Sequence, residues 1–137
     1  MNYKHIVQYY ETDKMGITHH SNYIRFMEEA RIWFLKEIGW GYDKMEEEGI
    51  ISPVVSVSCN YKKTTTFPDE IAISVSVLEV NQVKLKLGYT MTVGETVVCT
   101  AESVHCFLSS SGRPISIQKQ FPEFYQKLCE LSRGTKE

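Results

Sequence analysis

The stretch YYETDKMGITHHSNYIRFMEEARIWFLKEI, residues 9–38, decides the fold. It has the pattern of a strand end, a tight polar loop and one long helix that begins at Asn22. From Asn22 onward, apolar side chains fall on most of the circumference of the predicted helix, and a helix of this kind is buried rather than laid on the surface. Gly39 and Gly41 are expected to end it, because glycine accepts the left-handed conformation found after helix ends.

The loop before this helix carries the chemically interesting residues. Free backbone N–H groups and the positive end of the helix dipole lie at a helix start, where they can hold an anion or the developing negative oxygen of a reacting carbonyl. Asp13 precedes His20 by seven residues, so the loop can fold its carboxylate back towards those donors, an arrangement suited to acyl transfer. Taken alone, however, Asp13 has the pattern of a turn residue and His20 that of a capping or buried histidine.

Composition bounds the class of protein. A chain of 137 residues is one domain's worth, expected to span residues 1–131 with residues 132–137 as a flexible tail. The net charge of −2 gives no electrostatic reason to expect nucleic acid. The longest apolar run is far too short for a membrane span, and the N-terminus lacks the apolar segment of a signal peptide, so a cytoplasmic location is expected.

The four cysteines show no metal-binding or redox spacing. Without a C-x-x-C pair they are expected to be free, small, buried residues in a reducing compartment. Adjacent His19 and His20 suggest a metal at first sight. Neighbours in an extended segment point to opposite faces, and no third ligand follows at a recognisable spacing, so no metal site is predicted.

The remaining pattern predicts a sheet. Alternation with a period of two indicates one-sided strands, most clearly in residues 83–93. The predicted strands are residues 3–10, 51–61, 71–77, 83–93 and 96–108, with 115–117 extending the sheet, a short helical turn at 42–48 and a last helix opened by Pro122. The physical solution is an α+β fold, a curved antiparallel sheet wrapped around one long central helix. A single sheet cannot cover this helix on all sides, so we expect at least a homodimer, although a monomer could use the C-terminal helix as a lid.

A family resemblance rests on the run YYETDKMGITHHSNY, residues 9–23, and on FMEEAR, residues 26–31. These stretches resemble the signature of the hotdog-fold acyl-CoA thioesterases, in particular the 4-hydroxybenzoyl-CoA thioesterase family and its short acyl-CoA relatives. The later stretches SPVVSVSCNY, residues 52–61, and PDE, residues 68–70, are also similar. The resemblance covers nearly the whole chain and implies the hotdog fold.

The resemblance also implies roles for individual residues. Asp13 matches the catalytic carboxylate, which acts as nucleophile on the thioester or as general base for water. His20 matches the position whose backbone N–H polarises the carbonyl, and Gly16 matches the turn glycine. Tyr9 matches a tyrosine that lines the site, although Tyr10 keeps the family's Tyr-Glu order and is the alternative.

Further residues are expected to contact substrate. His19 stands where the family often has an aromatic residue and would shape the acyl pocket together with Tyr23. Asn22 lies at the helix start, where it is equally an ordinary cap. Lys62, with Lys63 and Arg113, would meet the phosphates of coenzyme A, or would simply be a solvated surface charge.

The function implied is hydrolysis of an acyl-CoA to a carboxylic acid and coenzyme A, by a homodimer or homotetramer. No cofactor is expected, because coenzyme A is part of the substrate and the thioester is already activated. Acyl carrier protein is the alternative carrier. Two other functions stay open: a non-catalytic acyl-CoA binding protein, and a dehydratase or hydratase on the same fold.

Overall fold

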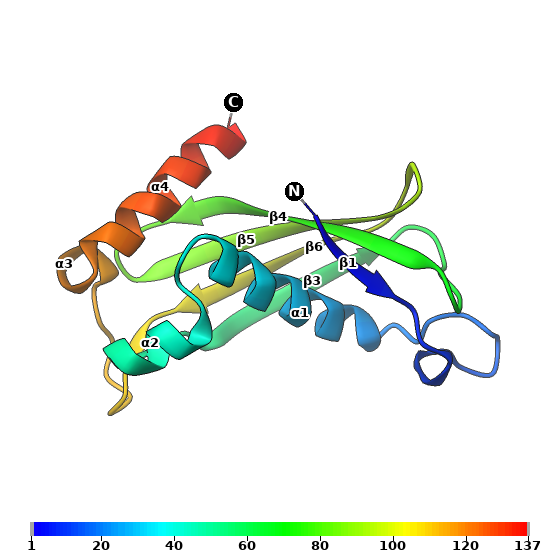
Figure 1. Cartoon of the computed structure of the whole chain (residues 1–137), viewed down its shortest axis with the longest axis horizontal. Helices are drawn as coiled ribbons and strands as arrows, with labels where there is room; N and C mark the ends of the chain where they lie inside the picture. Colours follow the sequence, from blue (N-terminus) through cyan, green and yellow to red (C-terminus); the bar gives the residue numbers. More distant parts are fainter. Residues whose placement is uncertain (1, 137) are drawn as a thin grey trace.

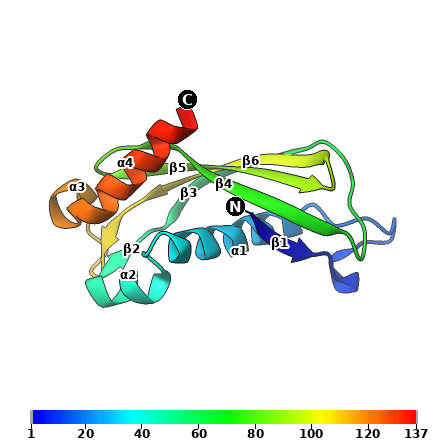
Figure 2. The same ribbon diagram turned by 45° about the horizontal axis from the view of Figure 1, so that its top comes forward.

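The computed structural model describes residues 2–136, which form an α+β fold with one long helix lying across a face of an antiparallel sheet (Figures 1 and 2). In chain order the elements are β1 (Tyr3–Ile6), the 3₁₀ helix η1 (Tyr9–Glu11), α1 (Asn22–Glu37), α2 (Tyr42–Glu48), β2 (Ile50–Ile51), β3 (Val54–Tyr61), β4 (Glu70–Val80), β5 (Lys84–Val93), β6 (Thr96–Cys106), β7 (Leu108–Ser109), α3 (Ile117–Gln120) and α4 (Pro122–Lys136).

The main sheet has the strand order β1-β4-β5-β6-β3, with every neighbouring pair antiparallel. Strand β5 lies at its centre and confirms the predicted alternation, since Leu85, Leu87, Tyr89 and Met91 are all buried. Strands β2 and β7 form a separate two-stranded sheet. The central strand and the long helix thus supply the two layers of the core.

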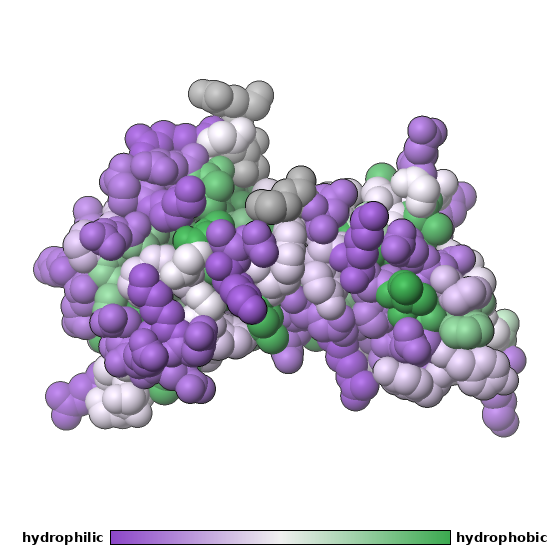
Figure 3. Space-filling view, in the orientation of Figure 1, coloured by the Kyte–Doolittle hydropathy of each residue, from purple (hydrophilic) through white to green (hydrophobic). Residues whose placement is uncertain are grey.

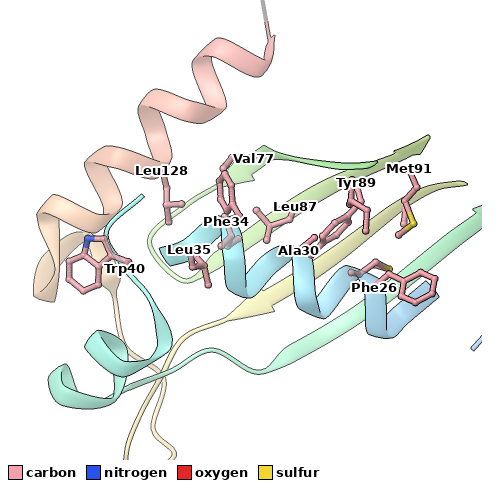
Figure 4. Close-up of a cluster of buried hydrophobic side chains, with 14 of the residues drawn as sticks. Phe26, Ala30, Phe34, Leu35, Trp40, Val77, Leu87, Tyr89, Met91 and Leu128 are labelled. Atoms are coloured by element: carbon pink, nitrogen blue, oxygen red, sulfur yellow. The ribbon is translucent and has the colours of Figure 1, made fainter. Parts of the chain in front are cut away.

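Helix α1 begins at Asn22 as predicted and buries one broad face. Phe26, Met27 and Ala30 are almost fully buried, and Figure 4 shows Phe26 and Ala30 facing the sheet. Each large side chain contributes roughly 1.5–3 kcal/mol by leaving water. Ile24 and Ile32 remain 45% and 39% exposed. The expectation of a helix covered on nearly all sides is therefore not met within one chain.

A second part of the core lies where α4 packs on β4 and on Trp40, which follows α1. The Trp40 ring stacks on Phe124 with centroids 4.7 Å apart. Leu128 of the same helix α4 is fully buried, and Figure 4 shows it together with Trp40. The last helix opens at Pro122 as predicted, but it continues through Lys136, and Ser132 is buried. The predicted tail is thus helical over 132–136, and residue 137 lies outside the described residues.

Two predicted strands have different bounds. β1 ends at Ile6 instead of running to residue 10, because Tyr9–Glu11 form a 3₁₀ turn in which the Glu11 carboxylate accepts from the backbone N–H of Gln8 at 2.7 Å. Residues 115–117 do not extend the sheet, because Ser116 caps α3 by accepting from the backbone N–H of Lys119.

Strand β3 corrects a further expectation. Its alternating pattern predicted one buried face, but Val54, Val55, Val57 and Tyr61 are all between 40% and 59% exposed. The reason is position: β3 is an edge strand paired only with β6, and α1 covers little of it. The apolar side of β3 is therefore available to a partner.

Polar side chains lie in the core beneath the second half of α1. Arg31 is only 8% exposed, and its Nε donates to the Tyr42 hydroxyl at 3.2 Å. The Ser103 hydroxyl lies 2.6 Å from the Tyr89 hydroxyl and 2.7 Å from His105 Nε2. Among the described residues, His105 Nδ1 has no hydrogen-bond partner. Burial, followed by the nearby Arg31 cation, lowers the pKa of His105 to about 4.

All four cysteines are free, as predicted, although only Cys99 is fully buried. Between residues 2 and 136, none of the helices has the length and apolar character needed to cross a membrane.

Candidate active site

The loop 12–20 is a hydrogen-bonded turn that fixes the Asp13 carboxylate. Gly16 N–H donates to the Asp13 carbonyl, and Asp13 N–H donates to Ile17 O, both at 2.9 Å. Met15 N–H donates to Asp13 Oδ1, also at 2.9 Å. Gly16 has a φ of +79°, a left-handed conformation that glycine adopts without strain. One carboxylate oxygen is thus held by the turn, and Oδ2 has no partner within the described chain.

The segment 64–67 supports this loop from the side. Thr18 N–H donates to Thr65 O at 2.8 Å, and the two hydroxyls lie 2.6 Å apart in a buried position. The Thr66 hydroxyl donates to Gly16 O at 2.7 Å. The Asp13 turn is therefore attached to the connection between β3 and β4.

Glu11 attaches the same loop to the helix. Its carbonyl accepts from His19 N–H and from the Asn22 side-chain amide, both at 2.9 Å. Its buried carboxylate lies 2.8 Å from His5 Nε2, while His5 Nδ1 lies 3.0 Å from Glu29 of α1. The Asn22 side-chain amide thus joins the loop to the helix. Asn22 was predicted to contact substrate, but it lines neither of the two hollows described below.

The N-terminus of α1 presents His20 to the surface. Its carbonyl accepts from Tyr23 N–H at 3.2 Å and from the Tyr61 hydroxyl at 3.3 Å. Within residues 2–136, no acceptor is assigned to its backbone N–H. Ser21, the residue before the helix, makes no capping hydrogen bond with its side chain. The backbone N–H of His20 at the helix start is therefore able to donate to a ligand.

His19 and His20 do not diverge as expected. Their rings stack with centroids 4.4 Å apart, because His20 begins the turn into α1 and is not part of an extended segment. In the chain from residue 2 to residue 136, no group of three histidine, cysteine or carboxylate side chains is placed to hold a metal ion. The expectation that the two histidine side chains point to opposite faces was therefore wrong.

A cavity of about 640 Å³ opens between the Asp13 turn and the start of α1. It brings together Asp13 and His20 with Tyr23 and Lys62, four of the residues predicted from the sequence. The remaining lining residues are Met15, Ile17, Thr18, Tyr61, Lys63 and Thr64. The cavity thus places a carboxylate and a helix start on one largely apolar hollow.

A smaller hollow of about 410 Å³ lies on the other side of the same turn. It is lined by Tyr9, Thr12, Asp13, Lys14, Gly16, Thr66 and Phe67. Asp13 is shared by both spaces, while Tyr10 lines neither. Of the two candidate tyrosines, Tyr9 is therefore the one that lines a hollow together with Asp13. His19 and Arg113 line neither space.

Two tyrosines are among the polar residues that line the larger cavity. Burial raises the pKa of Tyr23, whose hydroxyl lies 2.9 Å from Thr65 Oγ1. Partial burial and the neighbouring Cys59 thiol raise the pKa of Tyr61 to about 12. Both phenols are therefore neutral hydrogen-bonding groups near pH 7. The contribution of Tyr61 was missed, because its contact with His20 spans 41 residues of sequence.

Comparison with known proteins identifies the family. The model of the thioesterase-like superfamily matches residues 7–131. The chain is 35% identical over 121 residues to a protein of Aquifex aeolicus named "Putative esterase", covering 88% of this chain and 94% of that one. It is 34% identical over 121 residues to "Putative acyl-CoA thioesterase YneP" of Bacillus subtilis, covering 87% and 88%.

Solved structures agree with this relationship. The fold matches that of a DHNA-CoA thioesterase from Staphylococcus aureus with a TM-score of 0.92 and 26% identity, covering 98% of this chain and 92% of the other. The predicted α+β hotdog fold is confirmed by these matches. The chain therefore belongs to the thioesterase-like superfamily, and its predicted class of enzyme, a thioester hydrolase, is confirmed.

Proposed function

We propose that this protein hydrolyses acyl-CoA thioesters to a carboxylic acid and free coenzyme A, with Asp13 as the catalytic carboxylate. The observation that carries this proposal is the shared position of Asp13 and His20 on one cavity at the start of α1. One Asp13 oxygen is held by Met15 N–H, which leaves the other free to act.

In this mechanism the thioester carbonyl lies at the N-terminus of α1. The His20 N–H donates to the carbonyl oxygen, and its hydrogen bond strengthens as negative charge develops there. Asp13 Oδ2 takes a proton from water while the water oxygen bonds to the carbonyl carbon. The carbon–sulfur bond then breaks, and the proton passes to the departing thiolate. In the alternative route, an Asp13 oxygen bonds to the carbonyl carbon and the carbon–sulfur bond breaks, which releases the thiolate. Water then hydrolyses the mixed anhydride to the carboxylic acid and restores Asp13, whose proton passes to the thiolate. Neither route needs a cofactor.

Lys62 and Lys63 favour an anionic substrate. They follow the end of β3 at the cavity, and within the described chain neither pairs with a carboxylate. Two uncompensated cations beside a cavity raise the local concentration of a phosphorylated ligand and speed its encounter. This charge suits coenzyme A and also the phosphopantetheine group of acyl carrier protein, the alternative carrier.

The test is thiol release from a panel of short, medium, branched and aromatic acyl-CoAs. Asp13→Asn removes the acting oxygen's charge but keeps the size of the side chain, so turnover should fall by roughly 10²–10⁴. Asp43→Asn is the matched control, because Asp43 is exposed in the first turn of α2 and lines neither hollow.

Near-normal turnover by folded Asp13→Asn would contradict the role of Asp13. Saturable acyl-CoA binding without turnover by the wild-type chain would instead favour the non-catalytic binding protein. Release from a protein-bound thioester alone would identify acyl carrier protein as the carrier.

We also propose that the active form is at least a homodimer. The exposed apolar side of the edge strand β3, with Val55 at 59% exposure, is a surface that a second copy would cover, and the free edge can pair. Light scattering should give twice the chain mass of 15.8 kDa, or four times if two dimers associate. A cytoplasmic, reducing location is part of the same proposal, supported by the four free cysteines.

A further inference from the structure

The His5 imidazole lies between two carboxylates that belong to different elements. Its Nε2 is 2.8 Å from Glu11 Oε1 of η1, and its Nδ1 is 3.0 Å from Glu29 Oε1 of α1. A neutral imidazole has a single N–H group, so it can donate to only one of these oxygens, whereas an imidazolium can donate to both. The geometry therefore fits the charged ring, which joins η1 to α1.

Each of the two carboxylate oxygens accepts from a second donor. Gln8 N–H donates to Glu11 Oε1, and the Tyr3 hydroxyl donates to Glu29 Oε1, both at 2.7 Å. Burial, followed by this hydrogen bond to Glu29, raises the pKa of Tyr3 to about 12, so its phenol remains a donor. Because both carboxylates act as acceptors, an unprotonated nitrogen of His5 would face one of them without a hydrogen bond.

The elements around the ring supply few other charges. His5 packs on Phe26 of α1 with ring centroids 4.1 Å apart. In the sheet it is paired with Ile71 of β4, which is fully buried, and Glu70 before it points to the opposite face. Within the described chain, the titratable groups in contact with His5, directly or through a shared carboxylate, are Tyr3, Glu11 and Glu29.

The contact between His5 and Glu11 is shielded from water. Hydrophilic residues cover most of the face drawn in Figure 3, where water solvates them. The side chains of His5 and Glu11 are by contrast only 11% and 6% exposed, and that of Glu29 is 38% exposed. A polar group left without its partner costs more in such a place than at the surface, so loss of the contact should move the elements that it joins.

Glu11 also holds the loop of the candidate active site through its backbone carbonyl. This oxygen accepts from His19 N–H and from the Asn22 side chain, both at 2.9 Å. Asp13 lies two residues after Glu11, and His20, whose N–H is the proposed donor to the thioester, follows His19. The position of Glu11 relative to α1 therefore affects the distance between the catalytic carboxylate and this donor.

We propose that His5 is a positioning residue for thioester hydrolysis, whose charged ring joins Glu11 to Glu29 and so fixes Asp13 relative to the start of α1. The inference rests on the proposed function and adds to it a group that touches neither the substrate nor the reacting atoms. Loss of the ring proton leaves one N–H, so one of the two contacts breaks whichever nitrogen keeps it. Turnover should therefore fall as the pH rises through the titration of His5.

The kinetic test compares the pH profile of kcat for wild type, Glu29→Gln and Glu28→Gln. A glutamine amide at position 29 can donate to Nδ1 of a neutral ring, and its carbonyl can accept from Nδ1–H of a charged one. Glu29→Gln should therefore lose the alkaline fall and exceed wild type at high pH. Glu28→Gln is the matched control, because Glu28 is the exposed neighbour on α1, and it should keep the wild-type profile. The same alkaline fall in wild type and Glu29→Gln would overturn the proposal.

A second variant removes the ring itself. His5→Gln can hold one carboxylate but cannot span both, so kcat should fall about three- to tenfold at every pH, because a small misplacement of a catalytic group slows the reaction. KM should stay within about twofold of wild type, because His5 does not line either hollow at Asp13. An unchanged kcat in folded His5→Gln would overturn the positioning role.

Nuclear magnetic resonance tests the positioning without any substrate. The ring nitrogen shifts of His5 report whether both nitrogens carry a proton. The amide resonances of Met15, which donates to Asp13 Oδ1, and of His20 report the turn and the start of α1. Both amides should move with the His5 titration in wild type and lose this component in Glu29→Gln. His19 and His20 titrate in both proteins, so the difference between the two isolates the part due to His5.

These measurements separate failure of the inference from failure of the proposed function. Amides that follow the His5 titration in a chain that hydrolyses no thioester would support the link to the loop and contradict only the proposed function. Amides that stay fixed while His5 titrates would overturn the inference even if hydrolysis is normal. A ring with one unprotonated nitrogen at every pH at which the protein is folded would overturn it as well.

Discussion

Polar side chains near the start of helix α1 and those beneath its second half lie in opposite circumstances. At its start, His20 and Asp13 lie at the surface, and the hydrogen-bonding capacity of His20 N–H and Asp13 Oδ2 is unfilled. Beneath its second half, Arg31 and His105 are buried among hydroxyl groups that no substrate reaches. Exposure to solvent, more than residue type, therefore decides whether a polar group can act on a ligand or only affects the stability of the fold.

After Asp13→Asn, the largest effect should come from removing the donor at the start of α1. His20→Pro eliminates the backbone N–H, whereas His20→Ala keeps it and removes only the ring. Loss of one oxyanion donor costs roughly 10²–10³ in kcat, so the proline variant should fall by this factor and the alanine variant by much less. Steady-state kinetics on both, with circular dichroism to confirm folding, would check this. Equal losses in the two variants would assign the function to the imidazole instead.

The buried half of the comparison predicts a dependence of stability on pH. The pKa of His105 is lowered to about 4 from its ordinary value of 6.5, first by burial and then by Arg31. Between pH 6.5 and pH 4 the unfolded chain binds a proton at His105 and the folded protein does not. The free energy of unfolding is therefore highest above pH 6.5 and falls as the pH is lowered towards 4. This fall amounts to about 3 kcal/mol. Denaturant unfolding of wild type and His105→Leu between pH 7 and 4 should show a smaller decline in the variant. Parallel curves would contradict this.

Alanine substitutions at two glycines compare backbone strain introduced at the site with backbone strain introduced elsewhere. Gly16 in the Asp13 turn and Gly94 in the β5–β6 turn both have left-handed φ angles, +79° and +61°. An alanine at either position should cost about 1–2 kcal/mol of folding free energy. Only Gly16→Ala should also lower kcat/KM, because it distorts the turn that holds Asp13. Thermal melts and kinetics on both variants would show whether the two losses separate.

The smallest effect concerns two serines at helix starts. The Ser21 side chain makes no capping hydrogen bond to α1, whereas Ser116 accepts from Lys119 N–H of α3. Ser21→Ala should therefore change stability by less than about 0.5 kcal/mol, and Ser116→Ala should cost about 1 kcal/mol. A large loss in Ser21→Ala would mean that the start of α1 depends on this hydroxyl.

Local signals in the sequence predicted the parts of the fold that depend on near neighbours. The start of α1 at Asn22, the turn glycine at 16 and the alternation of β5 each follow from patterns within a few residues. The Asp13–His20 pair was predicted as a unit from the family resemblance and lies on one cavity.

Contacts between distant segments could not be predicted in this way. Tyr61 reaches His20 across 41 residues and Tyr23 reaches Thr65 across 42, so neither pair leaves a local pattern. The exposure of β3 was missed for a related reason, because an edge strand and a central strand have the same alternation. The burial of the Glu11 carboxylate beside His5 was not predicted either.

Backbone amides on either side of the His20 N–H group are hydrogen-bonded. His19 N–H is bound to Glu11 O and Tyr23 N–H to His20 O, whereas the His20 amide between them is unbound within the described chain. In an isotope-labelled sample the His20 amide should thus exchange with solvent faster than its neighbours. Its resonance would then serve as a built-in spectroscopic probe that reports, without any turnover, when an oxygen atom occupies the start of α1.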